Sequence, residues 1–412
     1  MNNNLSFNSI STNVLRINSA DLKDVSKERA TLIAKGRTLA YEYAARGKDA
    51  IAKALKANSD APHVLNATQY SQLNTQFQQE HLLYAAKKGC EFAGLPAPSS
   101  YEEFKKNAAT FYNNSAFLAT LQNIHQEVIT PILPAVYSEA VSQFADVVEV
   151  GFGETYSISI DSNDIPIFQD SSWGAARSVP RNTFYSKDYV LNPQPKTAEI
   201  SLKYMQLVGT GMDYGKYFAN IIAGVYAKTM GMWKEMMTAA IQNTTLVPSG
   251  LNYTFNTLNW MSAANKVSAL NHTAISNLVA TGGAIALSKV LPADVTGASN
   301  VNMDAAIASM LGADYVRAGY IGEFMAVRLL PMMDAIVPGT QNTTVETVLD
   351  QTKVYMMASN GKKPLTIGIS RDVPLTLEYE PSATSDFTIG VNLTIALDAV
   401  ATFASKMAVI TV

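Results

Sequence analysis

The chain has 412 residues, of which 48% are hydrophobic and 16% charged, and its formal net charge is −3. A chain of this length can bury one large core or a few smaller ones without disulfide or metal support. Its single cysteine, Cys90, excludes an internal disulfide framework and fits a reducing compartment. Soluble domains usually contain about 25% charged residues, and a deficit is typical of a surface that partners cover. A mildly charged soluble enzyme is the alternative interpretation.

The sequence predicts neither export nor a membrane span. Its N-terminus lacks the charged-then-apolar plan of a secretion signal. Since the sequence begins at Met1, we also expect no N-terminal segment to have been removed. Residues 387–412 are the most apolar segment, but three polar residues interrupt it, whereas a span needs about 20 nearly uninterrupted apolar residues.

The sequence pattern predicts that the first third of the chain is helical. A polar arm over residues 1–20 precedes three expected helices, at residues 26–57, 67–93 and 100–128. Gly94 and Pro96 should end the second helix. Ser100 and Glu103 have the spacing of a capping box at the start of the third.

The N-terminal region is basic, with ten Lys/Arg and six Asp/Glu in residues 1–60. Because dense Lys/Arg runs are missing, a solvated helix face is the favoured interpretation. The alternative is a weak, salt-sensitive contact with nucleic acid.

Residues 151–208 predict an extended β-hairpin. In the first arm, Glu154 to Asp161, apolar and polar residues alternate, as in a half-buried strand. The second arm is expected at Ile200, Leu202 and Tyr204, which share one face. The proline-containing segment between the arms is too long to be a structureless loop inside a compact domain.

A two-stranded ribbon is marginal in water, so the hairpin needs a neighbouring subunit to cover it. This need indicates an assembly protein. The expected intersubunit contacts are the large apolar and basic residues toward the tip: Phe168, Trp173, Arg177, Arg181 and Tyr185.

A long helix should follow the hairpin. Asp213 is a suitable N-cap, and apolar residues then recur at steps of three and four from Tyr214 to Ile241. Four methionines between residues 230 and 237 are interpreted as adaptable packing, because no Cys or His accompanies them.

The remaining sequence alternates short helices, short strands and Gly/Pro turns over residues 250–370, which predicts a mixed α/β unit. The clearest strand of the chain runs from Phe387 to Asp398 with perfect alternation. Its hairpin partner is expected at Leu375 to Glu380, across the turn from Pro381 to Asp386.

Catalytic patterns are scarce. His81 and Cys90 fall on opposite faces of one expected helix, and His125 and Glu127 are two residues apart, so neither pair makes a site. We expect no catalytic, metal-binding or cofactor-binding residues. The strongest competing motif is Gly209 to Gly215, a partial dinucleotide fingerprint that follows a strand. Asp213 would oppose a pyrophosphate there, so a sharp turn into the long helix is the favoured interpretation.

The order of these parts resembles the major capsid proteins of tailed bacteriophages, whose Hong Kong 97 fold is shared with encapsulins. Three short stretches of the sequence are also similar to sequences of that family. The similar stretches are residues 275–289, residues 312–322 and the ending at residues 405–412.

The resemblance implies an α+β capsid fold. Its expected parts are an N-terminal arm (1–62), a helical region and the start of a peripheral domain (63–150), the extended loop (151–208), a spine helix (209–248), an axial domain (249–372) and C-terminal peripheral strands (373–412). The helices of residues 63–128 are extra relative to the minimal fold. Lys187 or Lys196 would be nearest to a cross-link of the kind that some members form.

The implied function is that of a virion capsid protein assembled in the host cytoplasm. It would form hexamers and pentamers of a shell around double-stranded DNA, with portal and possibly scaffolding or decoration proteins as further partners. An encapsulin-like compartment shell is the first alternative, and a nucleotide-binding enzyme using Gly209 to Gly215 is the second.

Overall fold

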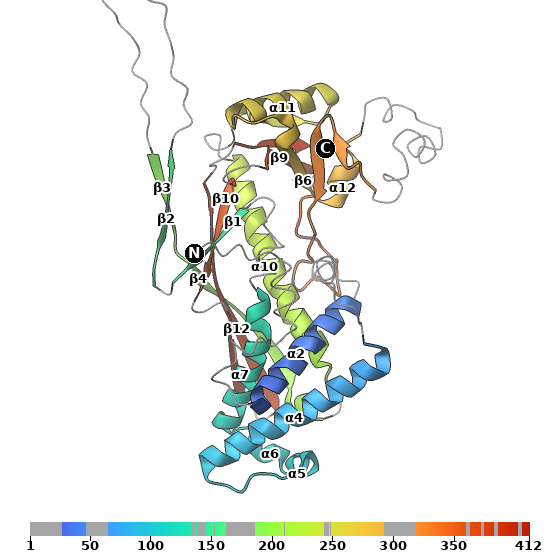
Figure 1. Ribbon diagram of the computed structural model, residues 1–412, viewed down its shortest axis with the longest axis vertical. Coiled ribbons are helices and arrows are strands. Elements are labelled where there is room, and N and C mark those ends of the chain that lie inside the picture. The colour runs from blue at the N-terminus through green and yellow to red at the C-terminus, as the bar shows by residue number, and fades with distance from the viewer. Residues whose placement is uncertain are drawn as a thin grey trace, which may run out of the picture.

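The computed structural model describes residues 27–46, 65–133, 137, 145–151, 153–161, 186–209, 211–242, 247, 249–291, 319–359, 363–371, 375–382, 386–402 and 406–412. A long helix runs through the length of the molecule (Figure 1). Helices gather at one of its ends, a sheet with short helices lies at the other, and a second sheet runs along its side.

The N-terminal third consists of helices α2 (Lys27–Arg46), α4 (Ala67–Ala93), α5 (Tyr101–Lys106), α6 (Ala108–Phe111) and α7 (Ser115–Ile129), followed by the turn η1 (Thr130–Ile132). The prediction for α4 is confirmed, and Gly94 ends it in the left-handed conformation. The prediction of one helix over 100–128 is wrong. The chain breaks at Asn107 and again at Asn114, whose side chain accepts a hydrogen bond from the Phe117 N–H to start α7.

The expected capping box at Ser100 is only half formed. Ser100 accepts from the Glu103 N–H, but the Glu103 carboxylate accepts from Ser99 instead. A complete box stands at the start of α4, where Asn66 and Gln69 cap each other. The sequence analysis missed it because Asn takes the place of Ser or Thr.

The long helix is confirmed as α10, Tyr214–Gln242, whose 29 residues span about 43 Å. Asp213 accepts a hydrogen bond from the Lys216 N–H and caps it, as expected. Met230 and Met237 are fully buried among apolar side chains, which confirms their packing role.

The helices α2, α4 and α7 form one core with the first half of α10. At Gly215 the helices approach so closely that an added Cβ would lie 2.7 Å from the Leu39 carbonyl oxygen of α2. The basic residues of α2 are also used within the chain. Arg29 pairs with Glu127, Lys35 pairs with Glu80, and Arg37 donates to the Glu127 carbonyl. The solvated-face interpretation is therefore wrong for the buried Arg37, while Arg29 and Lys35 remain partly exposed.

A five-stranded sheet lies beside α10, made of β1 (Ala145–Val150), β4 (Gln194–Lys203), β10 (Leu365–Ser370), β11 (Thr376–Pro381) and β12 (Thr388–Ala401). The predicted β11–β12 hairpin is confirmed, with Leu377 opposite Leu393. Most of the apolar residues of β12 are buried, while the alternate positions are half-buried.

The second arm predicted for the extended hairpin is wrong. Residues 194–203 form β4, which pairs antiparallel with β12. Ile200 and Leu202 pack against the core, and the short helix α9 (Tyr204–Val208) follows. The alternation was correctly seen, but period-2 alternation does not indicate which strand is the partner.

A six-stranded sheet at the far end of α10 contains β5 (Asn252–Thr254), β6 (Leu278–Gly282), β7 (Glu323–Phe324), β8 (Val327–Pro331), β9 (Lys353–Ala358) and β13 (Ala408–Thr411). The turns η2 (Ser249–Leu251) and η3 (Ile275–Asn277) and the helices α11 (Thr257–Leu270) and α12 (Ala284–Ser288) complete this mixed α/β unit, as predicted. The last strand, β13, lies between β5 and β9 and not with β11 and β12 as expected. Its residues Ala408–Ile410 are fully buried there, which explains the placement. The domain boundaries themselves stay predictions.

Among the described helices, none combines the length and apolarity that crossing a bilayer requires.

Candidate assembly interface

A two-stranded ribbon, formed by β2 (Tyr156–Asp161) and β3 (Ser186–Leu191), stands away from both larger sheets (Figure 1). The strands pair antiparallel, with Tyr156 opposite Leu191, Ile158 opposite Tyr189 and Ile160 opposite Lys187. Since residues two apart share a face, these six side chains form one mainly apolar face. The other face carries Ser157, Ser159, Asp188 and Val190.

The apolar face has little cover among the described residues. Leu191 at the root is buried, but no other described side chain of the ribbon is, and Tyr156 retains 43% of its exposure. The Lys187 ammonium lies 5.1 Å from the centre of the Tyr189 ring. This cation–π contact joins two residues of β3 and does not connect the ribbon to the rest of the described chain. Ile158, Ile160 and Tyr189 on this face are half-buried, so the face is only partly covered, and an isolated two-stranded sheet needs more cover than this in water.

The root of the ribbon is firmly held. Leu191 and Pro193 pack over Gly368 of β10, where an added Cβ would lie 3.5 Å from each of them. The Asn192 N–H donates to Asp398 of β12 at 2.8 Å. The ribbon is therefore an arm attached at one end to the five-stranded sheet.

The contact residues expected from the sequence, namely Phe168, Trp173, Arg177, Arg181 and Tyr185, lie outside the described residues. The structure instead points to the stem of the hairpin. Tyr189 and Val190 of β3 were missed, although the alternation from Lys187 to Leu191 could have revealed them. Lys187 lies on this stem, and Lys196 lies on β4.

The strand that follows the ribbon is also exposed. β4 pairs with β12, and no second partner is found within the described part of the chain. Pro195, Lys196, Glu199 and Lys203 lie along it, and prolines and charges of this kind are common on edge strands, where they limit uncontrolled pairing.

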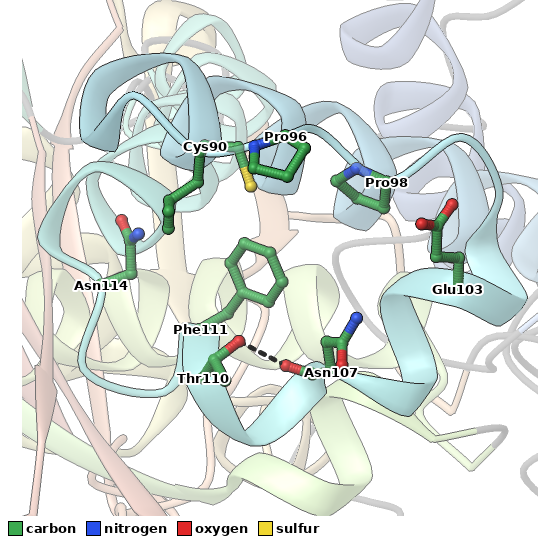
Figure 2. A pocket seen from close by; sticks show the side chains of 9 residues that line it. Cys90, Pro96, Pro98, Glu103, Asn107, Thr110, Phe111 and Asn114 are labelled. Atoms are coloured by element: carbon green, nitrogen blue, oxygen red, sulfur yellow. Dashed lines mark hydrogen bonds between the residues drawn. The ribbon is translucent and has the colours of Figure 1, made fainter.

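A shallow hollow of about 230 Å³ lies at the opposite end of the molecule, where α4 ends and α5 and α6 follow (Figure 2). The Phe111 ring points into it toward Cys90 and Pro96. Two of its polar side chains are already engaged: Asn114 caps α7, and hydrogen bonds from the Ser99 hydroxyl and N–H lower the pKa of Glu103. Burial raises the pKa of the Cys90 thiol, which disfavours the reactive thiolate.

Exposed apolar residues lie beside this hollow. Phe92 and Leu95, at the end of α4, are 81% and 59% exposed. This second apolar surface was not predicted, because a phenylalanine near the end of an amphipathic helix reads as part of the core.

The glycine motif at residues 209–215 does not form an open phosphate cradle. Asn74 of α4 accepts a hydrogen bond from the Tyr214 N–H and donates to the Met212 carbonyl. Tyr70 donates to Asp213 at 2.5 Å. The start of α10 is thus covered by protein, and a nucleotide-binding site there is contradicted.

No group of three or more His, Cys, Asp or Glu that could hold a metal ion occurs within the described ranges. His125 contacts Tyr379 while Glu127 contacts Arg29, so these two neighbours do not act together, as expected.

Comparisons with known proteins give only distant similarities. No family model and no curated protein sequence matches the chain. Among solved structures, it is similar to the mature capsid of bacteriophage PhiM1, with 12% identity and a TM-score of 0.41 over 65% of this chain and 85% of that one. The capsid of a native GTA particle gives 13% identity and a TM-score of 0.41 over 66% and 90% of the two chains. A virus-like particle from Pyrococcus furiosus gives 10% identity and a TM-score of 0.37 over 68% of this chain and 95% of that one. At these identities and TM-scores, the comparisons show only that part of the backbone follows a similar path, and they assign no family.

Proposed function

We propose that this chain is a shell-forming subunit, the major capsid protein of a tailed bacteriophage. Copies would assemble as hexamers and pentamers of a closed shell around double-stranded DNA. The observation that carries the proposal is the β2–β3 ribbon, an arm anchored at Leu191 whose apolar face is only partly covered by the described residues.

The ribbon supports assembly for a thermodynamic reason. Burying a fully exposed large apolar side chain contributes roughly 1.5–3 kcal/mol. Because Ile158 and Tyr189 are already half-buried, covering the rest of both on a neighbour would contribute about 1–2 kcal/mol per contact. If the ribbon of each copy covers the body of the next, the contact is head-to-tail, and such contacts close into rings when the rotation permits. Rings and a closed shell are the assemblies that this geometry favours.

The rest of the molecule is consistent with a structural role. The helix α10 and the strand β12 provide a long, continuous frame, and the six-stranded sheet at one end of α10 would meet its copies around a ring axis. Portal, scaffolding or decoration proteins would be secondary partners. Weak contacts with packaged DNA would come from basic residues outside those that α2 uses internally.

The first test is direct visualisation of the expressed chain. Sedimentation velocity and electron micrographs should detect ring-shaped oligomers or closed particles. A chain that stays monomeric under all assembly conditions contradicts the proposal. Nucleic acid inside particles purified from infected cells would support a genome shell, whereas protein cargo would support a compartment shell instead.

A matched pair of variants tests the role of the ribbon. Replacing Ile158 and Tyr189 by Ser removes two large side chains of the apolar face, and we expect about tenfold weaker association per contact, which corresponds to about 1.4 kcal/mol. Replacing Ser159 and Asp188 by Asn alters the polar face of the same strands and should leave assembly nearly unchanged. Equal effects of the two pairs would refute the assignment of the apolar face as the contact surface.

A further inference from the structure

Two histidines from separate helices meet in the interior of the helical end of the molecule. His81 of α4 and His125 of α7 both have 0% exposure, and their ring centroids are 5.3 Å apart. Sequence reasoning missed the pair because it considered each histidine only with its neighbours along the chain. The available signal was the position of His81 four residues after Phe77, on the apolar face of α4.

The pair lies at a junction of four elements. Phe77 of α4 stacks on His81 at 4.5 Å, and Tyr214 of α10 meets the same ring edge-on at 4.7 Å. The Tyr379 hydroxyl of β11 is hydrogen-bonded to His125 Nδ1 and lies 3.0 Å from the Tyr217 hydroxyl of α10. The two rings thus help to join α4 and α7 to the long helix and to the five-stranded sheet.

The surroundings of both imidazole rings favour the neutral, singly protonated form. His81 Nδ1 donates to the Phe77 carbonyl at 2.5 Å, which leaves Nε2 as an acceptor. The Nε2 atoms of His81 and His125 are buried and have no hydrogen-bond partner among the described residues. When either ring carries both protons, its Nε2–H is therefore a donor of a charged ring in an apolar site without an acceptor, which is costly.

The charged groups of the surrounding elements do not offset that cost. Glu127 of α7 is engaged by Arg29, and its carbonyl by Arg37 of α2, while Glu42 of α2 accepts from the Leu65 N–H. At the start of α10, Asp213 accepts from Tyr70.

The remaining charges of the packed elements face solvent. Glu80 of α4 pairs with Lys35 at the surface, Lys216 of α10 is exposed, and so are Glu378 and Glu380 of β11.

The other titratable groups at the pair are Tyr214, Tyr217 and Tyr379, whose pKa values burial raises, so they stay neutral. Burial lowers the pKa of His81 to about 4. Burial and the nearby His81 hold the pKa of His125 well below its ordinary value.

We propose that the His81–His125 pair is an acid-sensitive latch. With both rings neutral, α4 and α7 stay docked on α10 and β11. When the pH falls, the rings become protonated in a transiently opened state, and that state is then favoured. This inference rests on the packing of the single chain and does not depend on the proposed shell function.

The direction and size of the effect follow from proton linkage. A buried histidine with a lowered pKa binds no proton in the closed state, whereas an exposed one binds a proton below its ordinary pKa of about 6.5. Stability is therefore complete above that pH and declines as the pH falls toward 4. For two such residues, the opening equilibrium constant should rise about 10-fold from pH 7 to pH 6 and about 500-fold from pH 7 to pH 5.

Amide hydrogen exchange of the full chain measures this opening. Labelling at pH 7, 6 and 5, with times lengthened tenfold per pH unit to offset the slower intrinsic chemistry, reports the opening of each peptide. We expect the corrected exchange of α4 and α7 to rise about 500-fold from pH 7 to pH 5. The corrected exchange of peptides from β6 and β9 should not rise by a comparable factor. A flat response in α4 and α7 overturns the proposal, as does an equal rise in every peptide.

Substitutions identify the titrating groups. His81→Phe and His125→Phe keep an aromatic ring and remove the proton site, so each single variant should retain only about a 25-fold rise and the double variant nearly none. The control is His272→Asn, at an exposed histidine with φ of 50°, a conformation that Asn tolerates. It should behave like the parent. If either single variant keeps the full 500-fold rise, the latch is refuted.

Discussion

Gly215 tests whether α2 and α10 are in direct backbone contact. In the substitution Gly215→Ala, the new methyl group would lie 2.2 Å from the Tyr70 hydroxyl and 2.7 Å from the Leu39 carbonyl oxygen. Ordinary van der Waals contact begins at 3.4 Å, so the helices would have to separate. The Leu39 oxygen belongs to backbone and cannot rotate away.

The expected magnitude combines two terms. Overpacking of a well-packed core costs about 1–3 kcal/mol, and the upper end applies here because backbone is involved. Alanine is more favourable than glycine inside a helix by about 1 kcal/mol. The free energy of unfolding should therefore fall by about 2 kcal/mol.

Gly224 provides a control in the same helix. It is exposed, and no atom lies within 4 Å of an added Cβ. Gly224→Ala should therefore raise the free energy of unfolding by about 0.5–1 kcal/mol. Urea unfolding of the unassembled chain, followed by circular dichroism, measures both variants. If Gly215→Ala proves as stable as Gly224→Ala, the close approach of α2 to α10 is wrong.

Two smaller predictions concern the other helices. Replacing Asn66 by Ala removes the side-chain acceptor of the Gln69 N–H at the start of α4 and should lower the free energy of unfolding by about 1 kcal/mol. Urea unfolding with no change beyond a few tenths of a kcal/mol would contradict the capping role. Lys35 and Glu80 form a partly exposed ion pair. A double-mutant cycle to Ala should therefore give a coupling free energy of about 0.2–1 kcal/mol, and this energy should shrink at high salt. A coupling free energy that does not depend on salt would contradict an electrostatic origin.

The sequence was most informative where a local pattern decides the structure alone. The apolar spacing and the Asp213 cap defined α10, and uninterrupted alternation together with a short turn defined the β11–β12 hairpin. Short connections also specify the partner, because a chain that turns within a few residues has few choices.

The misplaced arm and the missed contacts depend on distant partners. The alternation of Ile200 and Leu202 fits a strand beside β2 as well as one beside β12, and only the packed core distinguishes them. His81 and His125 likewise meet only when two helices dock on α10. The break at Asn107 and Asn114 was missed because the apolar pattern runs on through a corner, where the Asn114 side chain caps the next helix.

The connection of the ribbon to the sheet has a mechanical consequence. β3 passes through Asn192 and Pro193 directly into β4, which is registered with β12 along ten residue pairs from Lys203 to Gln194. A force that draws the ribbon along its own axis loads those pairs in shear, so many hydrogen bonds must yield together and not one after another. An arm attached in this way can carry tension between neighbouring molecules while the body that bears it keeps its shape.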